Sequence, residues 1–174
     1  MRYANINYCE CTNGLGWGIS LYTQGCSRRC EGCFNPSTWD PARGESFNYA
    51  IKKDILATIQ DKPFIERFSV LGGEPLEDYN LRDLSALIGS IRLANKDIKI
   101  WVFSGYTWEE LQKRAAESNN LFLSSILENI DVLVDGPFVQ EKKDISLKFA
   151  GSSNQRIIDV QKTLCRNGVC LLGI

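Results

Sequence analysis

The sequence of 174 residues contains no histidine. Without an imidazole the chain has no Ser-His-Asp triad, no histidine general base and no histidine-ligated zinc or copper. Net charge is also nearly absent, because 20 Lys and Arg residues face 21 Asp and Glu residues. Such a chain exerts no long-range attraction on nucleic acid or anionic lipid. We therefore expect no nucleic-acid partner, and any metal site must use cysteine, carboxylate or backbone ligands.

Long hydrophobic runs are missing as well. No apolar stretch approaches the roughly 18 residues of a membrane span, and the polar start of the chain lacks the apolar core of a signal peptide. We expect a cytoplasmic protein with no membrane partner. Seven cysteines are many for such a protein. Because thiols stay reduced in the cytosol, clustered cysteines there indicate metal binding or catalysis more than disulfides.

The length and the absence of linkers or internal repeats predict a single domain over residues 1–174. Strand-like runs alternate with helix-like runs, which is typical of a parallel sheet with crossover helices. Thr107 and Glu110 form a capping box that opens one of the helices. The expected strands are 19–23, 68–71, 98–103 and 131–134, and the expected helices are 49–60, 81–93, 107 to about Ser118, and 121–129.

The strands are short apolar runs, as in a sheet that helices cover. A complete (β/α) barrel of eight units takes about 250 residues, so this chain has room for about 5 or 6 units. The sequence therefore predicts an α/β fold, an incomplete (β/α) barrel with a lateral gap. In such folds the chemistry gathers at the carboxyl ends of the strands.

Three cysteines follow the first expected strand at a C-x3-C-x2-C spacing: Cys26, Cys30 and Cys33. Three closely spaced thiolates can hold an iron–sulfur cubane and leave one iron open, whereas a ferredoxin cluster or a closed zinc site takes four ligands. Two other interpretations remain: a zinc site completed by a distant cysteine, and three unrelated thiols. Phe34 can shield one side of a cluster. Arg28 and Arg29 could offset the charge of a thiolate-ligated cluster, and a solvated basic loop is the simpler interpretation of both.

The cysteine triplet resembles the cluster motif of the radical S-adenosylmethionine enzymes. Gly72, Gly73, Glu74 and Pro75, at the end of the second expected strand, are similar to that family's GGE-P element. The resemblance implies that the methionine part of the ligand lies along the strand edge beside the two glycines. Backbone carbonyls and Glu74 would accept hydrogen bonds from its ammonium group, and Pro75 would stop the strand from pairing further.

Further segments resemble the activating enzymes of the anaerobic (class III) ribonucleoside-triphosphate reductases, from about residue 13 to residue 159. These segments are 13–18, 101–106, 131–138, 144–147 and 151–156, and the last is the most specific. The resemblance implies a 4Fe-4S cluster, S-adenosylmethionine, and a partner reductase that presents a glycine-containing loop. It also implies a low-potential electron donor such as flavodoxin.

The remaining site residues carry narrower expectations. Many radical S-adenosylmethionine enzymes place an aromatic residue just before the third cysteine, where this chain has Gly32. We count Gly32 among the cofactor-binding positions and expect Phe34 to pack against the adenine instead. Ser104 and Asp135 are candidates for the ribose, the carboxylate or a nearby cation. An N-cap serine and a turn aspartate are equally good interpretations of these two residues.

Two other functions remain open at the level of the sequence. The chain could activate a different glycyl-radical enzyme, such as pyruvate formate-lyase, or it could be a non-catalytic iron–sulfur or zinc module. Four more cysteines, two near each end, would form a second metal site only if the chain ends meet; buried or free thiols are the simpler interpretation. They are Cys9, Cys11, Cys165 and Cys170.

Overall fold

The computed structural model describes residues 1–117, 120–166 and 168–174. They form a seven-stranded sheet in the order β3-β1-β2-β4-β5-β6-β7. Strands β2, β4, β5 and β6 are parallel, whereas β1, β3 and β7 pair antiparallel with their neighbours. The strands are β1 (Arg2–Glu10), β2 (Gly18–Thr23), β3 (Glu45–Ser46), β4 (Arg67–Gly72), β5 (Lys99–Phe103), β6 (Val132–Asp135) and β7 (Arg156–Asp159).

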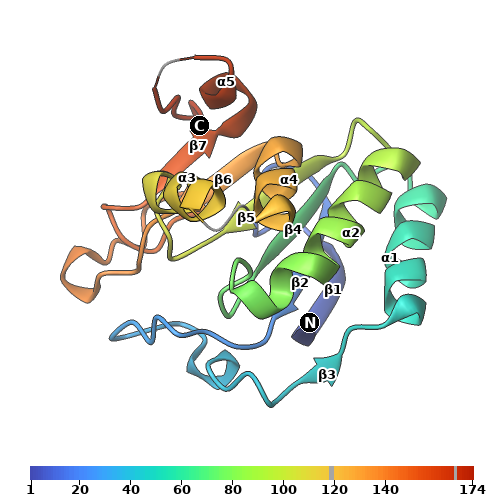
Figure 1. Cartoon of the computed structure of the whole chain (residues 1–174), viewed down its shortest axis with the longest axis horizontal. Helices are drawn as coiled ribbons and strands as arrows, with labels where there is room; N and C mark the ends of the chain where they lie inside the picture. Colours follow the sequence, from blue (N-terminus) through green and yellow to red (C-terminus); the bar gives the residue numbers. More distant parts are fainter. Residues whose placement is uncertain (118–119, 167) are drawn as a thin grey trace.

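Helices cover one face of the parallel strands. Figure 1 shows α1, α2 and α4 side by side in front of the sheet, with α3 beside α4 and α5 next to β7. Crossovers through α1, α2 and the pair α3 and α4 join the four parallel strands in turn. The helices are α1 (Tyr49–Asp61), α2 (Asp78–Ala94), α3 (Trp108–Glu117), α4 (Leu121–Asn129) and α5 (Val160–Leu164), with short 3-10 helices η1 (Pro36–Thr38) and η2 (Gln140–Lys142).

The two faces of the sheet differ in chemistry because successive side chains of a strand point to opposite sides. Toward the helices the strands present a continuous apolar core, in which each fully buried aliphatic side chain contributes roughly 1.5–3 kcal/mol. The opposite face carries an aromatic and aliphatic cluster on β5 and β6, around Trp101, Val132 and Val134. On β2 and β4 that same face is polar, with buried Ser20, Ser69 and Arg67.

The glycine-rich segment 13–18 wraps the buried Arg67 side chain. Arg67 Nη1 donates to the Asn13 carbonyl at 2.8 Å, and Nη2 donates to Glu10 Oε1 at 2.7 Å. A Cβ at Gly14 would lie 2.6 Å from Arg67 Cδ, and one at Gly18 would lie 2.8 Å from Arg67 Cζ. Glycine at these positions therefore leaves room for a guanidinium in the interior, where Glu10 neutralises it.

The expected strands and helices are confirmed to within a few residues. The capping box is also present, because the Thr107 N–H donates to Glu110 and the Glu110 N–H donates to the Thr107 hydroxyl. The expected helix end at Ser118 lies outside the described residues. We expected about 5 or 6 repeating units, but the described residues have four parallel strands. No crossover α-helix leads into the outer strands: residues 11–17 connect β1 to β2, residues 24–44 lead from β2 to β3, and residues 136–155 connect β6 to β7.

We predict that the Glu10–Arg67 pair makes stability fall in acid. Burial alone would raise the pKa of Glu10, but hydrogen bonds from Ser20, Thr12 and Arg67 lower it to about 2. The stabilisation is thus present above about pH 4.5 and lost as the pH falls toward 2. Glu10→Gln should cost about 3 kcal/mol at pH 7, and less at lower pH, in urea denaturation. A difference from the wild type that stays constant with pH would contradict this assignment.

Candidate functional site

A cavity of about 430 Å³ opens at the carboxyl ends of the parallel strands. The sheet brings together residues from five parts of the chain: the segment after β1, the loop after β2, the end of β4, the end of β5 and the segment that begins at the end of β6. Most of the site residues expected from the sequence line this cavity, namely Cys26, Cys30, Cys33, Phe34, Gly72, Gly73, Glu74 and Ser104. Gly32, Pro75 and Asp135 do not line it.

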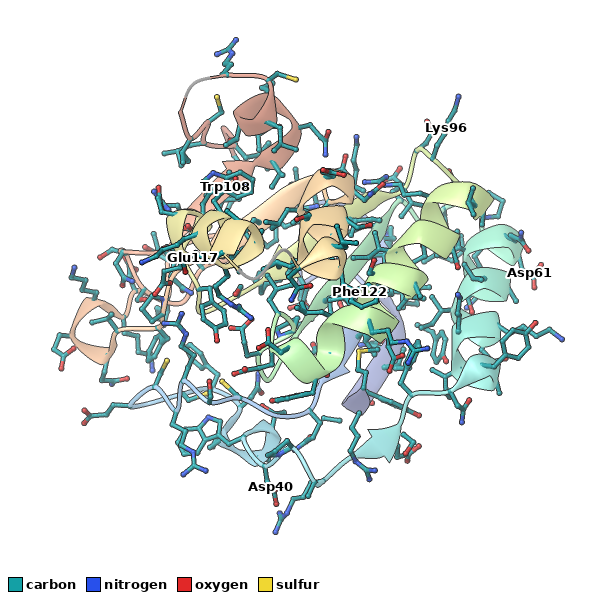
Figure 2. The ribbon with its side chains drawn as sticks, viewed as in Figure 1. Asp40, Asp61, Lys96, Trp108, Glu117 and Phe122 are labelled. Carbon is teal, nitrogen blue, oxygen red and sulfur yellow. The ribbon has the colours of Figure 1, made fainter. Side chains whose placement is uncertain are left out.

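Backbone hydrogen bonds fix the cysteine loop to the segment that follows it. The Gly25 N–H donates to the Thr38 carbonyl at 2.7 Å, and the Cys26 N–H donates to the Trp39 carbonyl at 3.1 Å. Between the cysteines, Arg29 adopts a φ of 45° and Gly32 one of 69°. These left-handed conformations turn the loop back on itself, so that all three cysteines border one cavity. Figure 2 labels Asp40, where this part of the chain reaches the lower edge of the molecule.

The donor set suits an iron–sulfur cluster better than a single ion. No three Cys, Asp or Glu side chains within the described ranges are placed to hold one metal ion. A cubane takes one thiolate at each of three irons, so its cysteines lie further apart than the ligands of one ion. Burial raises the pKa of the Cys26 thiol. Because the ligand is the thiolate, metal binding at Cys26 must release a proton.

The two glycines at the end of β4 line the cavity, and they are also required because the neighbouring backbone leaves no room for a Cβ. A Cβ at Gly72 would lie 2.8 Å from the Thr23 nitrogen, and one at Gly73 would lie 2.3 Å from the Gly25 carbonyl oxygen. The Gly73 N–H also donates to the Thr23 carbonyl at 2.8 Å. Side-chain-free residues therefore let the end of β4 lie directly against the start of the cysteine loop. Pro75 is buried beside them, outside the cavity lining.

Glu74 joins the ends of β4 and β5 through its buried carboxyl group. Its Oε1 accepts from the Leu76 N–H at 3.0 Å and the Ser104 hydroxyl at 2.8 Å, and its Oε2 accepts from the Gly105 N–H at 2.7 Å. Burial raises the pKa of Glu74 to about 7, although these hydrogen bonds oppose the shift. Glu74 therefore holds the cavity wall together, a role that the sequence did not indicate. Ser104 acts with it.

Phe34 connects the cysteine loop to the segment after β6. Its side chain is 61% exposed, and its ring centroid lies 5.1 Å from that of Phe138. A Cβ at Gly151 would lie 2.9 Å from the Phe34 ring, so this glycine allows the close contact. A Cβ at Gly32 would lie 2.0 Å from Gln140 Oε1, which makes Gly32 a packing position against that same segment.

Asp135 does not line the cavity; of the partners expected for it, the structure shows the nearby cation, which is Arg156. Its Oδ2 accepts from the Trp108 N–H at 2.7 Å, and its Oδ1 accepts from Arg156 Nε at 3.0 Å. Trp108 is labelled in Figure 2 at the start of α3. The carboxylate thus fixes the start of α3 to the end of β6, and Arg156 balances its charge.

Segment 151–156 organises the far wall of the cavity. Gln155 Oε1 accepts from the Gly151 N–H at 2.8 Å, and Gln155 Nε2 donates to the Gly136 carbonyl at 2.9 Å. Asn154 donates to the Pro137 carbonyl at 2.8 Å. These bonds fix the segment against the loop that follows β6. Lining residues outside the motifs found in the sequence include Thr12, Trp39 and Phe149; their side chains carry no local sequence signal.

The remaining four cysteines do not converge. Cys9 and Cys11 lie on or just after β1, whereas Cys165 and Cys170 follow β7. Four strands, β2, β4, β5 and β6, separate β1 from β7 in the sheet. The chain ends therefore do not meet as a second metal site would require.

The comparisons with known proteins agree with this geometry. Residues 12–158 match a family described as a 4Fe-4S single cluster domain. The anaerobic ribonucleoside-triphosphate reductase-activating protein of Escherichia coli K12 is 36% identical over 156 residues, which are 89% of this chain and 96% of that protein. The protein of the same name from Vibrio cholerae is 34% identical over 158 residues, covering 90% and 97%.

The chain belongs to the anaerobic ribonucleoside-triphosphate reductase-activating protein family. A phage member of the family, from Enterobacteria phage T4, is 31% identical over 159 residues, with 90% of this chain and 93% of the phage protein covered. The resemblance to these activating enzymes, inferred from segments 13–18, 101–106, 131–138, 144–147 and 151–156, is thereby confirmed. No helix among the described residues of this family member is long and apolar enough to cross a membrane.

For this family member we predict a pH signature of Glu74 opposite to that of Glu10. The folded-state pKa of about 7 lies above the usual value, so the wild type loses stability as the pH rises from about 4.5 through 7. Glu74→Gln has no carboxyl proton to lose and should gain about 3 kcal/mol relative to the wild type over this range. Urea denaturation of the iron-free protein measures it. The control is the exposed Glu31→Gln, whose free energy of unfolding should fall with rising pH as that of the wild type does. If the free energy of unfolding is independent of pH in this control as well as in Glu74→Gln, the prediction is contradicted.

Proposed function

We propose that this protein activates an anaerobic ribonucleoside-triphosphate reductase by installing a glycyl radical. Cys26, Cys30 and Cys33 would hold a 4Fe-4S cluster, and the edge of β4 at Gly72 and Gly73 would hold S-adenosylmethionine; together these groups would supply the radical chemistry that removes a hydrogen atom from a glycine Cα of the reductase. The observation that carries the proposal is the cavity itself, because three cysteines of one loop and the glycine-rich end of β4 border the same space. Its volume lies in the usual range for small-molecule sites.

The residues divide into ligands, binding surface and support. Cys26, Cys30 and Cys33 bind three of the irons. Gly72 and Gly73 leave the strand edge open to the methionine part of the ligand, whose ammonium group can donate to backbone carbonyls there. Other residues complete the site: Phe34 covers the adenine, Glu74 with Ser104 fixes the wall, and Gly32, Pro75 and Asp135 support the loop and strand ends from outside the cavity.

The protein substrate needs an open approach to this cavity. We propose that residues 1–174 form one domain, an incomplete (β/α) barrel whose inner surface is the sheet face away from the helices. Parallel strands occupy only part of the sheet, which would leave a lateral gap wide enough for a folded glycine loop. The remaining partners of this proposal are a cytoplasmic low-potential electron donor, such as flavodoxin, and the reductase itself.

We predict that Cys30→Ala abolishes both cluster binding and S-adenosylmethionine cleavage. Cys30 lines the cavity, and two thiolates leave one iron of the cubane without its protein ligand. The measurements are iron and sulfide content and the 4Fe-4S absorption spectrum after anaerobic reconstitution. Cys165→Ala removes an exposed cysteine next to α5 and should retain both properties. A full spectrum with undiminished cleavage in Cys30→Ala would overturn the ligand assignment.

We also predict selectivity among glycyl-radical enzymes. The reconstituted, reduced protein should form 5'-deoxyadenosine and a glycyl radical signal with anaerobic ribonucleoside-triphosphate reductase, and at least tenfold less with pyruvate formate-lyase. Electron paramagnetic resonance and product analysis measure the two. A radical on pyruvate formate-lyase alone would favour the other activase function. An intact cluster that never yields 5'-deoxyadenosine would favour a non-catalytic module.

A further inference from the structure

Arg28 differs in its surroundings from Arg29, the other basic residue of the cysteine loop (residues 24–36). It lies between Cys26 and Cys30 in sequence and lines the cavity with them. Its side chain is 21% exposed, whereas its neighbour Arg29 is exposed and does not line this cavity. Of the two interpretations of these arginines, the solvated basic loop therefore does not hold for Arg28.

An aromatic contact and an ion pair hold the Arg28 guanidinium. Its Cζ lies 3.9 Å from the centroid of the Tyr106 ring, and Arg114 Cζ lies 4.3 Å from the same centroid. Arg28 Nη2 also lies 3.1 Å from Glu110 Oε2. A cation over an aromatic ring at these distances is attractive, increasingly so when it is shielded from water. The β5–α3 turn and the start of α3 thus hold the Arg28 side chain of the cysteine loop through Tyr106 and Glu110.

The aliphatic part of the Arg28 side chain also packs closely, against Gly105. A Cβ at Gly105 would lie 3.3 Å from Arg28 Cγ and 3.4 Å from Glu74 Oε2. Gly105 therefore sits between the Arg28 stem and the Glu74 carboxyl group, and the three together form a continuous part of the cavity wall. A second link ties the same loop to α2, because Ser27 donates from its N–H to Glu77 at 3.0 Å.

We propose that Arg28 is a positioning residue that fastens the cysteine loop to the β5–α3 turn and holds one fixed positive charge beside the cluster. The proposal deepens the proposed function, because it assumes a cluster on the three cysteines. A fixed cation stabilises the more negative, reduced form of a thiolate-bound cluster. Glu110 offsets part of that charge, so the two residues act on the reduction potential with opposite signs.

The test compares variants of the reconstituted holoprotein in an anaerobic redox titration followed by electron paramagnetic resonance. Arg28→Met keeps the length of the stem without the charge, and should shift the potential to more negative values. At a fixed solution potential the ratio of reduced to oxidised cluster should fall roughly tenfold. This is the effect expected from removing a unit charge within about 10 Å of the cluster at an effective dielectric constant of about 20. Arg29→Met removes the same formal charge from an exposed position and should leave the potential unchanged.

Two further variants keep the proposal testable if Arg28→Met loses its cluster. Glu110→Gln retains Arg28 and should shift the potential to more positive values. Tyr106→Leu removes the aromatic ring and should accelerate iron loss to a chelator severalfold, whereas Tyr106→Phe keeps the ring and should match the wild type. Equal potentials in Arg28→Met and Arg29→Met, or shifts of the same sign in Arg28→Met and Glu110→Gln, would overturn the proposal.

These readouts separate the inference from the proposed function. The potential and the rate of iron loss are measured without S-adenosylmethionine or reductase. A wild-type cluster that shows the Arg28 effect but cleaves no S-adenosylmethionine would contradict the proposed function alone. Normal cleavage with no Arg28 effect would contradict this inference alone.

Discussion

The attachment of one irregular loop to the ends of parallel strands is the constraint on which the site depends. Three cysteines at positions 26, 30 and 33 can serve one cluster only if the loop is held in a single shape, and the loop itself contains little regular structure. Hydrogen bonds to Thr38 and Trp39, the close approach of Gly73 to Gly25, and the contacts of Arg28 supply that shape. Removing any one of these contacts should make the positions of the three cysteines less well fixed, and the loop has no fourth cysteine that could replace one of them.

The two faces of the sheet differ: one packs an apolar core against the helices, and the other carries polar and aromatic side chains. Aliphatic residues on the helix side give the stability, while the opposite side carries polar groups on β2 and β4 and aromatic groups on β5. Two buried carboxylates pair with arginines, Glu10 with Arg67 and Asp135 with Arg156. Glu74 differs from them, because its buried carboxyl group accepts from three uncharged donors. It ties β4 to β5 at the cavity wall.

Sequence reasoning found the parts of the molecule whose signals are local. Periodic apolar residues located α2 and α4, the capping box located the start of α3, and the cysteine spacing located a loop that borders the cavity. It missed β1, β3 and β7, because β1 has no continuous apolar run, β3 has two residues and β7 has four. It left the roles of Asp135 and Arg28 open, since the partners that define them, Arg156 and Tyr106, lie far away along the chain.

The central claim is that three cysteine ligands leave one iron of the cluster open to S-adenosylmethionine. The most direct measurement is the electron paramagnetic resonance spectrum of the anaerobically reduced protein, recorded with and without S-adenosylmethionine. The account predicts that addition changes the g values of the reduced cluster, because the ligand's amino and carboxylate groups would bind the open iron. A spectrum that stays the same at saturating S-adenosylmethionine would contradict it.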